Sequence, residues 1–495
     1  MYEYRKLYAF DRDNIESATH LIKSIQNNWK LDAKLERIED YFYITDEYDK
    51  IMNGSKFYII GRKGSGKSAI AEYISNTQTA NMFSKKLSFK NFPFNTLYSC
   101  ENPDFTRPNQ YISLWKLIIY THIGRLMLKD HSISSHSYET LRKIFPFEDC
   151  ENVDKEINKT VIKSFNLNLL GTGGGIECSK TNSYDMLNFY QKIEILEPII
   201  KNEIGKNKYF ILFDELDEDF KAFETQKEKN DYLNLITSLF KATQDIKSIF
   251  KNNIHQICPI IFLRNDIYNL IEDSDKNKWE DFSIRIEWGS QKIKKLLAHR
   301  LSKTLELEEV LPFEIIWNKL FSKEKMILGG NKKRRIQIFD YISRSTQMRP
   351  RDFVKHITAC ASVASEENYK FIGPSAVKKA DKKFSIYFRD ELVDEIQGYI
   401  PEIRKIFTIL STFHKWAFSF KEFKTAYDEQ FNSNPNKLDV TFVLEKLFDF
   451  SVIGNSPKYG RSSHEFFKYT NPDATFNYKD TIIVHRGLFK SLQII

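Results

Sequence analysis

One run of eight residues constrains the fold of this chain more than any other feature: Gly61-Arg62-Lys63-Gly64-Ser65-Gly66-Lys67-Ser68. The run matches G-x-x-x-x-G-K-[ST], which is the spacing of a loop that wraps around phosphate groups. The apolar residues 56–60 precede it, and residues 69–75 favour a helix. We therefore expect a buried parallel strand, a phosphate-binding loop and a helix whose positive end faces an anion.

Each residue type in this loop has a physical reason. Gly64 and Gly66 let the backbone turn so that successive N–H groups point inward at the phosphates. Lys67 brings a positive charge to the outer phosphates, and the Ser68 hydroxyl is a ligand for Mg²⁺. A solvated basic turn is the alternative, and the complete match to the motif argues against it. The predicted nucleotide-binding residues are Gly61, Arg62, Lys63, Gly64, Ser65, Gly66, Lys67, Ser68 and Ala69.

The rest of the first 290 residues alternates between strand and helix patterns. Apolar runs at 209–213, 259–263 and 282–288 predict three more buried strands. Helices are expected around them, and this alternation is typical of an α/β fold with a parallel sheet between two helical layers. The expected helices are 12–50, 108–128, 183–204, 227–249 and 290–307.

Two carboxylates follow the strand at 209–213. Asp214 lies at its carboxyl end, where ligands bind in open parallel sheets, so we expect it to orient Mg²⁺. Glu215 next to it can accept a proton from an attacking water molecule. This interpretation takes the strands 56–60 and 209–213 to be neighbours. The acidic residues 217–219 that follow are interpreted as a solvated helix start rather than as further metal ligands.

Three further side chains could reach the terminal phosphate. Arg264 and Asn265 end the strand at 259–263. Their side chains could sense the γ-phosphate, and the alternative is that the two residues only form a turn before the next helix. Arg351 opens a helix after residue 349 and could close over the phosphates as a charged clamp. Its alternative is an arginine that only caps a helix at the surface.

The pattern predicts four regions. An N-terminal helical segment occupies residues 1–50, and the nucleotide-binding core occupies 51–289. A helical lid follows at 290–385, and a last region covers 386–495. In the last region three helices precede β-like pieces at 465–469 and 481–485, an order typical of a winged-helix domain. The three helices are expected at 398–413, 420–430 and 438–449.

Residues 146–182 look like an insertion in the core. Two short strands, 165–169 and 175–178, are joined by the glycine-rich residues 171–174. No clear helix follows these glycines, so a hairpin turn is favoured over a second phosphate-binding loop.

Composition and charge limit the cellular setting. The 495 residues are 41% hydrophobic, and no stretch is apolar over the length of a membrane span. The five cysteines are widely spaced and odd in number, which favours reduced thiols. We expect a cytoplasmic protein that has no membrane partner.

The net charge of +8 permits a nucleic-acid partner without arguing for one. Residues 391–495 hold equal numbers of basic and acidic side chains, 13 of each, so the last region is expected to contact protein rather than DNA. The better candidates for nucleic acid are the basic runs Lys332–Arg335 and Lys378, Lys379, Lys382 and Lys383, and solvated surface is their alternative.

Four motifs in this order, GRKGSGKS, YFILFDELDE, IIFLRND and MRPRDF, resemble the AAA+ and STAND branches of the P-loop ATPases. The chain particularly resembles a bacterial family near the archaeal origin-recognition initiators, whose members end in a winged-helix region. The resemblance implies the standard roles for Lys67, Ser68, Asp214 and Glu215. It also implies that Asn265 is the sensor-1 residue, Arg264 the STAND arginine and Arg351 the sensor-2 residue, with Arg349 as the second choice.

One departure from that resemblance is informative. AAA+ rings place a trans-acting arginine after sensor 1, but residues 266–284 contain no arginine. We therefore expect a regulatory ATP switch with Mg²⁺ as cofactor, rather than a hexameric motor. Antiviral defence with a separate effector protein is the setting that the resemblance implies, and a homo-oligomer is compatible with it. The alternatives are an ATP-dependent DNA-binding initiator or loader, and a nucleotide-binding scaffold without turnover.

Overall fold

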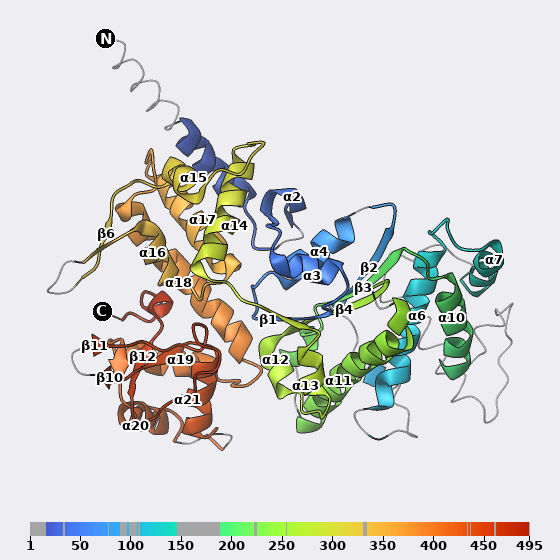
Figure 1. Ribbon diagram of the computed structural model, residues 1–495. Helices are drawn as coiled ribbons and strands as arrows, with labels where there is room; N and C mark the ends of the chain where they lie inside the picture. The colour runs from blue at the N-terminus through green and yellow to red at the C-terminus, as the bar shows by residue number, and fades with distance from the viewer. Residues whose placement is uncertain are drawn as a thin grey trace, which may run out of the picture. The chain divides into compact units, whose positions relative to one another are not determined.

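The computed structural model describes residues 16–32, 35–77, 79–89, 97–98, 106, 109–145, 189–221, 225–253, 255–329, 334–432, 434–435, 437–459 and 462–494 (Figure 1). The chain forms two compact units. The sheet unit comprises Ile44–Arg62 and Gly66–Glu287. The helical unit comprises Met1–Tyr43, Lys63–Ser65 and Trp288–Ile495. The expected insertion at 146–182 lies outside the described residues.

The sheet unit is built on a five-stranded sheet in the order β2-β3-β4-β1-β5. All of its pairings are parallel. The chain is therefore an α/β protein, as the alternation of strands and helices predicts. The strands are β1 (Tyr58–Gly61), β2 (Met82–Ser88), β3 (Lys208–Asp214), β4 (Ile257–Arg264) and β5 (Ser283–Ile286).

The order of the strands corrects one expectation and adds one element. β1 and β3 are not neighbours, because β4 pairs with both of them and is buried along its whole length. The strand β2 at the sheet edge was not among the predicted strands. Its sequence, MFSKKLS, lacks the continuous apolar run of the central strands because only Leu87 is fully buried.

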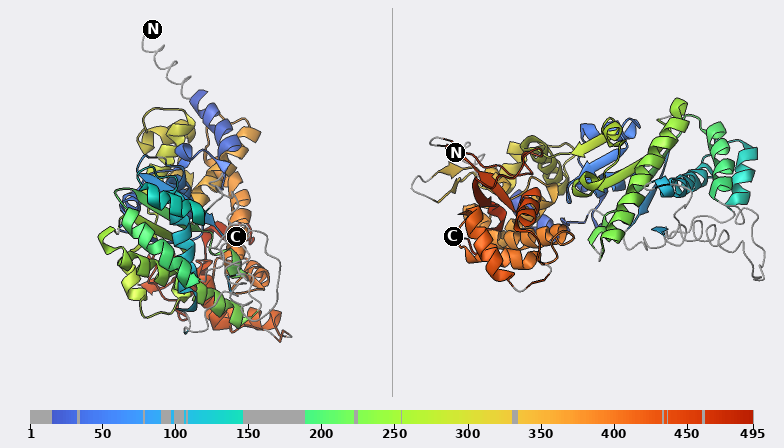
Figure 2. Two further views of the ribbon diagram at one scale, coloured as in Figure 1. Left: turned by 90° about the vertical axis from the view of Figure 1, so that its right-hand side faces the viewer. Right: turned by 90° about the horizontal axis from the view of Figure 1, so that it is seen from below.

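Helices cover both faces of this sheet (Figures 1 and 2). From β1 the chain crosses two strand positions to β2 at the sheet edge. It then runs in the opposite direction across the sheet, from β2 to β3 and from β3 to β4. Right-handed crossovers therefore place α4 (Lys67–Asn76) on one face, and α6 (Ile112–Met127) and α11 (Gln226–Ile249) on the other. α6 packs against α10 (Phe189–Glu203), α11 and β3. The shorter helices of this unit are α3 (Asp46–Met52), α7 (Ser135–Ile144), α12 (Asn265–Leu270) and α13 (Lys276–Glu280).

The N-terminal helix is shorter than expected. Residues 16–28 are helical, but α2 (Ile38–Tyr41) and α3 are separate helices, and only α3 belongs to the sheet unit. Leu21, Ile25 and Trp29 are buried in the core of the helical unit, so the N-terminal segment is part of that core. The Trp29 indole also donates a 3.0 Å hydrogen bond to the Thr304 hydroxyl.

The helical unit has two hydrophobic cores that share one helix, α18 (Pro374–Ile396). Its first turns, with Ala376 and Ala380, belong to the first core, whereas Phe384 and the later residues belong to the second. α18 therefore continues without a break through the boundary expected at residue 385. The other elements of the first core region are α14 (Ser290–Thr304), α15 (Phe313–Leu320), α16 (Ile338–Ser343), α17 (Pro350–Glu366), β6 (Met326–Ile327) and β7 (Arg335–Ile336).

The second core lies among three helices and a small antiparallel sheet. The helices are α19 (Ile403–Thr412), α20 (Phe420–Gln430) and α21 (Val440–Asp449). The sheet has the order β8-β12-β9, with β8 (Ala417–Phe418), β9 (Ile453–Ser456) and β12 (Thr481–Val484). A short hairpin, β10 (Lys458–Tyr459) and β11 (Ser462–Ser463), follows β9, and the 3-10 turn η7 (Arg486–Leu488) follows β12.

The strand expected at 465–469 is wrong. Phe466 forms only an isolated bridge to Asn455. Asn455 belongs to β9, and β9 is the strand that pairs with β12 in this part of the chain. β9 has the sequence IGNS, and the glycine inside it interrupts the apolar pattern that would predict a strand. A Cβ atom at Gly454 would lie 2.5 Å from the Phe466 carbonyl oxygen, so the close approach of the two chains requires glycine there.

Candidate nucleotide-binding site

Two glycines shape the phosphate-binding loop. Gly64 and Gly66 have φ angles of +77° and +100°, which side chains other than glycine rarely adopt. Gly66 is the N-cap residue of α4, and a Cβ atom there would meet nothing within 4 Å. Glycine is therefore required at this position for its backbone conformation rather than for lack of space. This conformation directs the first N–H groups of α4 toward the interior of the loop.

Lys67 is folded back into its own loop. Its ammonium group donates hydrogen bonds to the carbonyl oxygens of Gly61 at 2.9 Å and Arg62 at 3.0 Å. Enclosure of the ammonium group lowers the pKa of Lys67 to about 8, although the Asp217 carboxylate acts in the opposite direction. Phosphate oxygens would offer this group stronger acceptors than two neutral carbonyls.

Ser68 and Asp214 meet at the carboxyl end of the sheet. The Ser68 hydroxyl, in the first turn of α4, donates a 3.2 Å hydrogen bond to Oδ1 of Asp214, although β4 lies between β3 and β1, the strand that precedes the loop. This is possible because α4 crosses the sheet and contacts β1, β4, β3 and β2. Asp214 is only 2% exposed, and its burial raises its pKa, while the Lys86 ammonium opposes that rise.

These residues fit Mg²⁺. A hydroxyl and a carboxylate next to a phosphate-binding loop are the two protein ligands that this cation takes, and phosphate and water oxygens complete its shell. Oδ2 of Asp214 is buried and has no hydrogen-bond partner, although the Lys86 ammonium lies 3.2 Å away as an ion-pair partner. Among the described residues, no group of three or more His, Cys, Asp or Glu could form a closed metal site.

Glu215 has a strained backbone and a held side chain. Its φ angle is +60°, which is uncommon for a residue with a side chain. The Ser88 hydroxyl donates a short hydrogen bond to Oε2 of Glu215. Ser88 ends β2, in register with Asp214 on β3. The carboxylate next to Asp214 is therefore held by a side chain of the neighbouring strand, β2.

Sequence reasoning missed the contribution of β2 to this site. Lys86 and Ser88 lie on the same face of that strand, since side chains two residues apart share a face. Lys86 also pairs with Glu72 of α4 at 2.6 Å. The polar residues at alternate positions in SKKLS could have indicated an edge strand. They could not have indicated that β2 pairs with β3.

Arg264 is already paired. Its guanidinium lies 2.6 Å from an Asp266 carboxylate oxygen and 3.5 Å from one of Asp217, and the residue is 2% exposed. The register places Arg264 opposite Gly61, at the start of the loop. Asn265 is the first residue of α12 and is half-buried. Both residues are therefore at the strand end expected for them, with Arg264 held by two carboxylates.

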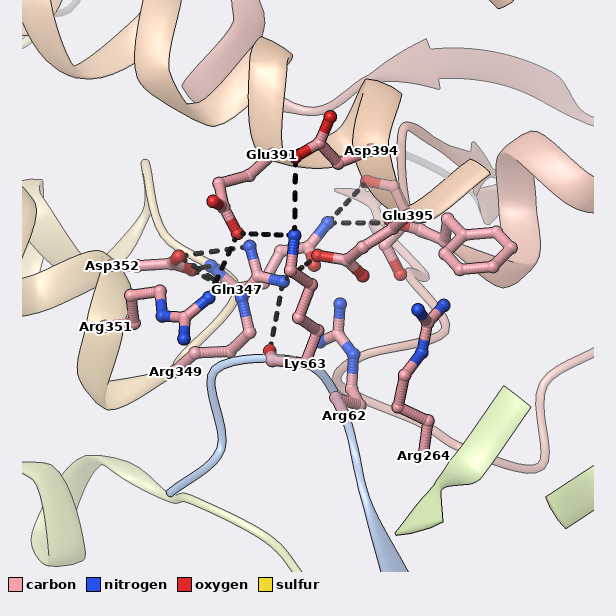
Figure 3. A network of polar contacts seen from close by, with 12 residues as sticks. Arg62, Lys63, Arg264, Gln347, Arg349, Arg351, Asp352, Glu391, Asp394 and Glu395 are labelled. Atoms are coloured by element: carbon pink, nitrogen blue, oxygen red, sulfur yellow. Dashed lines mark hydrogen bonds and ion pairs between the residues drawn. The ribbon is translucent and has the colours of Figure 1, made fainter. Parts of the chain in front are cut away.

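The loop tip, Lys63–Ser65, belongs to the helical unit, and acidic residues of α18 hold it (Figure 3). The Lys63 ammonium lies 3.3 Å from Glu391 and 3.7 Å from Asp394. Arg351 pairs with the same oxygen of Glu391 at 3.3 Å, and its side chain is 31% exposed. A Cβ atom at Gly64 would lie 3.2 Å from Cβ of Arg351, so this arginine stands against the loop.

Arg349 differs from Arg351 in its surroundings. It is buried, it forms ion pairs with Asp352 at 3.0 Å and Glu395 at 2.5 Å, and it donates to the Lys63 carbonyl oxygen at 3.3 Å (Figure 3). Burial acts to lower the pKa of Arg349, but the two carboxylates outweigh it and raise the pKa above its usual value. Arg349 therefore anchors the loop tip, whereas Arg351 is the more accessible cation.

Ser65, the last residue of the loop tip, is held by Trp288, two residues before α14. The Trp288 indole donates a 2.8 Å hydrogen bond to the Ser65 carbonyl oxygen. The Ser65 hydroxyl is buried and has no hydrogen-bond partner among the described residues, so it is available to a bound ligand. Ala69 is half-buried in the first turn of α4.

The basic runs named for nucleic acid lie on the helical unit. Lys332 and Lys333 are outside the described residues, and Arg335 is exposed on β7. On α18, Lys379 pairs with Glu367 at 2.8 Å and Lys383 with Glu366 at 2.7 Å. These pairs neutralise part of the second run.

Comparison with known proteins gives one family match. Residues 291–393 match the family described as the FunZ-associated C-terminal helical domain, a range that runs from α14 into α18. No curated protein sequence matches the chain. In the helices that the structure describes, none combines the length and the apolar character needed to cross a membrane.

Several solved structures are similar over most of the chain. Cdc6p from Pyrobaculum aerophilum is 12% identical, with 90% of this chain and 88% of that chain covered and a TM-score of 0.29. The ORC2 protein of Aeropyrum pernix, in its ADPNP-ADP complexes, is 10% identical, with 92% and 95% covered and a TM-score of 0.39. Drosophila ORC bound to DNA is 10% identical, with 90% and 84% covered and a TM-score of 0.26. All three TM-scores are below 0.5.

Proposed function

We propose that this chain binds ATP with Mg²⁺ at the loop Gly61–Ser68 and acts as a slowly hydrolysing regulatory switch of the AAA+/STAND type. The hydrogen bond between Ser68 and Asp214 carries the proposal. It joins the hydroxyl and the carboxylate that a phosphate-bound Mg²⁺ needs, although the two residues are 146 positions apart. The loop glycines and the start of α4 supply the phosphate-binding N–H groups beside them.

The residues at the site have separate roles in the proposed hydrolysis. Lys67 and the first N–H groups of α4 bind and orient the outer phosphates. Glu215, held by Ser88, accepts the proton of the attacking water molecule. Mg²⁺, held through Ser68 and Asp214, would neutralise charge that develops on the phosphate oxygens. Arg264 ends β4, the strand next to β1, and Asn265 begins α12, where residues that report the state of the γ-phosphate would lie.

The pairing of the basic residues supports a switch. Lys63 and Arg351 are bound to Glu391 and Asp394 of α18 within the helical unit. Phosphate groups compete for the same cations, because ammonium and guanidinium groups bind phosphate with charge-assisted hydrogen bonds. ATP would therefore exchange contacts inside the helical unit for contacts with the nucleotide, and this differential affinity is what a ligand-driven switch requires.

The partner that we propose is a protein. The C-terminal region, whose three helices and β8-β12-β9 sheet have a winged-helix-like order, carries no net charge from residue 391 onward. The surface of α21 is acidic, with Glu445 and Asp449 next to one basic residue, Lys446. We further propose a bacterial defence setting with a separate effector chain. A homo-oligomer is compatible with this function.

Phosphate release from ATP tests the proposal. The purified wild type and the Glu215→Gln variant are compared with and without double-stranded DNA, and Glu218→Gln serves as the control because Glu218 is exposed and three residues away. Slow release that requires Glu215, ignores Glu218 and is indifferent to DNA supports the switch. Equal rates in all three proteins would leave only a nucleotide-binding scaffold.

A DNA-binding initiator or loader is the second candidate. The observation in its favour is the winged-helix-like order of α19, α20 and α21 followed by β9 and β12. This function predicts ATPase stimulation by duplex DNA and binding that weakens steeply with salt. Neutralising Lys332–Arg335 should then abolish binding. Binding that is absent, or flat with salt, rejects it.

A further inference from the structure

The helical unit contains a polar pocket that the nucleotide site does not use. Its volume is about 390 Å³, and its walls come from α16 and the residue after it, from α18, and from η7 and the turn that follows. The end of β6 closes one side. The polar residues that line it are Tyr341, Arg344, Lys378, Asp381, Arg486 and Lys490.

Positive charge predominates in this pocket. Four cationic side chains face one carboxylate, and none of the four forms an ion pair within 4.0 Å with any carboxylate of the described residues. The contrast with two neighbouring lysines of α18 is informative, since Lys379 and Lys383 are each paired with a glutamate. Of these three lysines of α18, Lys378 is the one without an ion-pair partner among the described residues, and it lines the pocket.

The one carboxylate is already engaged. Asp381 accepts a 2.6 Å hydrogen bond from the Tyr341 hydroxyl, and its other oxygen lies 3.5 Å from Nε2 of the buried His356. The Arg486 guanidinium lies 4.6 Å from the centre of the Tyr341 ring. Tyr341 thus orients both groups, and Arg486 is held at the pocket by stacking rather than by an ion pair.

The cations also repel one another. Burial lowers the pKa of Arg344, and the nearby Arg486 and Arg334 lower it further, while Glu465 acts in the opposite direction. A bound anion would relieve this repulsion. Guanidinium and ammonium groups that line one pocket can bind phosphate through charge-assisted hydrogen bonds.

We propose that this pocket binds the phosphate group of a phosphorylated ligand, at a second anion site on the helical unit. The volume falls within the range of small-molecule sites, about 300–1,000 Å³. Two sources offer this chemistry, a free phosphorylated small molecule and a backbone phosphate of nucleic acid. Lys378 lies on the same helix as Glu391, so such a ligand is a candidate input for the switch. That last step rests on the proposed function, whereas binding to the pocket does not.

Two double variants that remove the same charge test the site. Arg344→Gln with Lys490→Gln removes two exposed cations of the pocket, and Lys379→Gln with Lys383→Gln removes two exposed cations of α18 outside it. Each pair is made in the full chain carrying Lys67→Ala, so that the phosphate-binding loop lacks its ammonium group and binds the probes less. Inorganic tripolyphosphate is titrated by calorimetry, and a 20-base-pair duplex without terminal phosphates by fluorescence anisotropy. Thermal unfolding checks that all variants are folded.

The expected result is a loss of affinity of about tenfold or more in the pocket variant and less than about twofold in the control, because only the pocket variant removes cations that would form charge-assisted hydrogen bonds with the phosphate. Pocket-dependent binding of tripolyphosphate alone identifies a free phosphorylated ligand as the source. Pocket-dependent binding of the duplex alone identifies the nucleic-acid backbone. Equal losses in the two double variants, or no binding of either probe below about 1 mM, overturn the proposal.

Discussion

The ammonium group of Lys86 lies 3.2 Å from Oδ2 of Asp214 and 2.6 Å from Oε1 of Glu72. Lys86 comes from β2, which pairs directly with the strand that ends in Asp214. A protein cation therefore sits beside the carboxylate that we assign to Mg²⁺, and it compensates a charge that would otherwise be buried without a partner.

Replacing Lys86 should make folding stability depend on Mg²⁺. In Lys86→Met the Asp214 carboxylate loses its neighbouring cation, so we expect a loss of about 2–4 kcal/mol in unfolding free energy in the presence of EDTA. Mg²⁺ should restore part of it, because the metal replaces the lost charge. Urea titrations with EDTA and with Mg²⁺ measure both values. Lys86→Arg keeps the charge and should lose much less.

The same variant should show a defined pH dependence. The pKa of Asp214 is raised by burial, and removing Lys86 raises it further. A carboxyl group whose pKa is higher in the folded state than in the unfolded state costs no stability at low pH, and its cost grows as the pH rises through the folded-state pKa. The deficit of Lys86→Met should therefore shrink toward pH 4. A deficit that is constant with pH would contradict the role given to Asp214.

Binding of Mg·ATP should take up a proton at alkaline pH. The pKa of Lys67 is about 8 in the free loop, and phosphate groups raise it, so between the two values the complex holds a proton that the free protein lacks. At pH 8.5 we expect an uptake of about half to one proton, and affinity that falls with further increase in pH. Calorimetry in buffers of different ionisation enthalpy measures the uptake. Lys63→Gln leaves Lys67 in place and should keep it.

Local sequence was sufficient for the loop and insufficient for its surroundings. The spacing of Gly64, Gly66 and Lys67 defines a backbone geometry that is determined within eight residues, and the φ angles follow from it. The insertion of β4 between β1 and β3 depends on pairing between distant segments, which a buried apolar run does not specify. Lys86 and Ser88 were missed for the same reason, because a polar edge strand has no strong pattern of its own.

The partners of the charged residues were equally hidden in the sequence. Arg351 was expected to be a clamp and Arg349 was only the second choice, yet the difference between them depends on the carboxylates of α18. Those carboxylates are about 40 residues further along the chain. Charge pairing across that distance has no periodicity that a single sequence displays.

Releasing Lys63 and Arg351 from α18 should tighten ATP binding. In the double variant Glu391→Gln with Asp394→Asn, the two cations lose their carboxylate partners and become available to phosphate. We expect affinity to rise about three- to tenfold, since partly exposed ion pairs contribute up to about 1 kcal/mol each. Fluorescent-nucleotide titration measures it. Glu366→Gln, which breaks the exposed pair with Lys383, is the control and should leave affinity unchanged.

Removing the Ser88 hydroxyl should slow hydrolysis without weakening ATP binding. Ser88 donates to Oε2 of Glu215, which we propose as the base, so its loss frees the carboxylate to adopt other positions. We expect Ser88→Ala to lower kcat about tenfold while KM changes little, and Ser88→Thr to retain most of the activity because it keeps a hydroxyl at the same place.

Ser84→Ala provides the matched comparison for this position. Ser84 lies on the same face of β2, one full repeat before Lys86 and two before Ser88, and its hydroxyl contacts the Ser75 carbonyl oxygen of α4 rather than the acidic pair. Its loss should leave both constants near those of the wild type. If Ser84→Ala and Ser88→Ala slow turnover equally, β2 acts only as a structural edge. If Ser88→Ala raises KM and leaves kcat alone, Ser88 contributes to substrate binding rather than to holding Glu215.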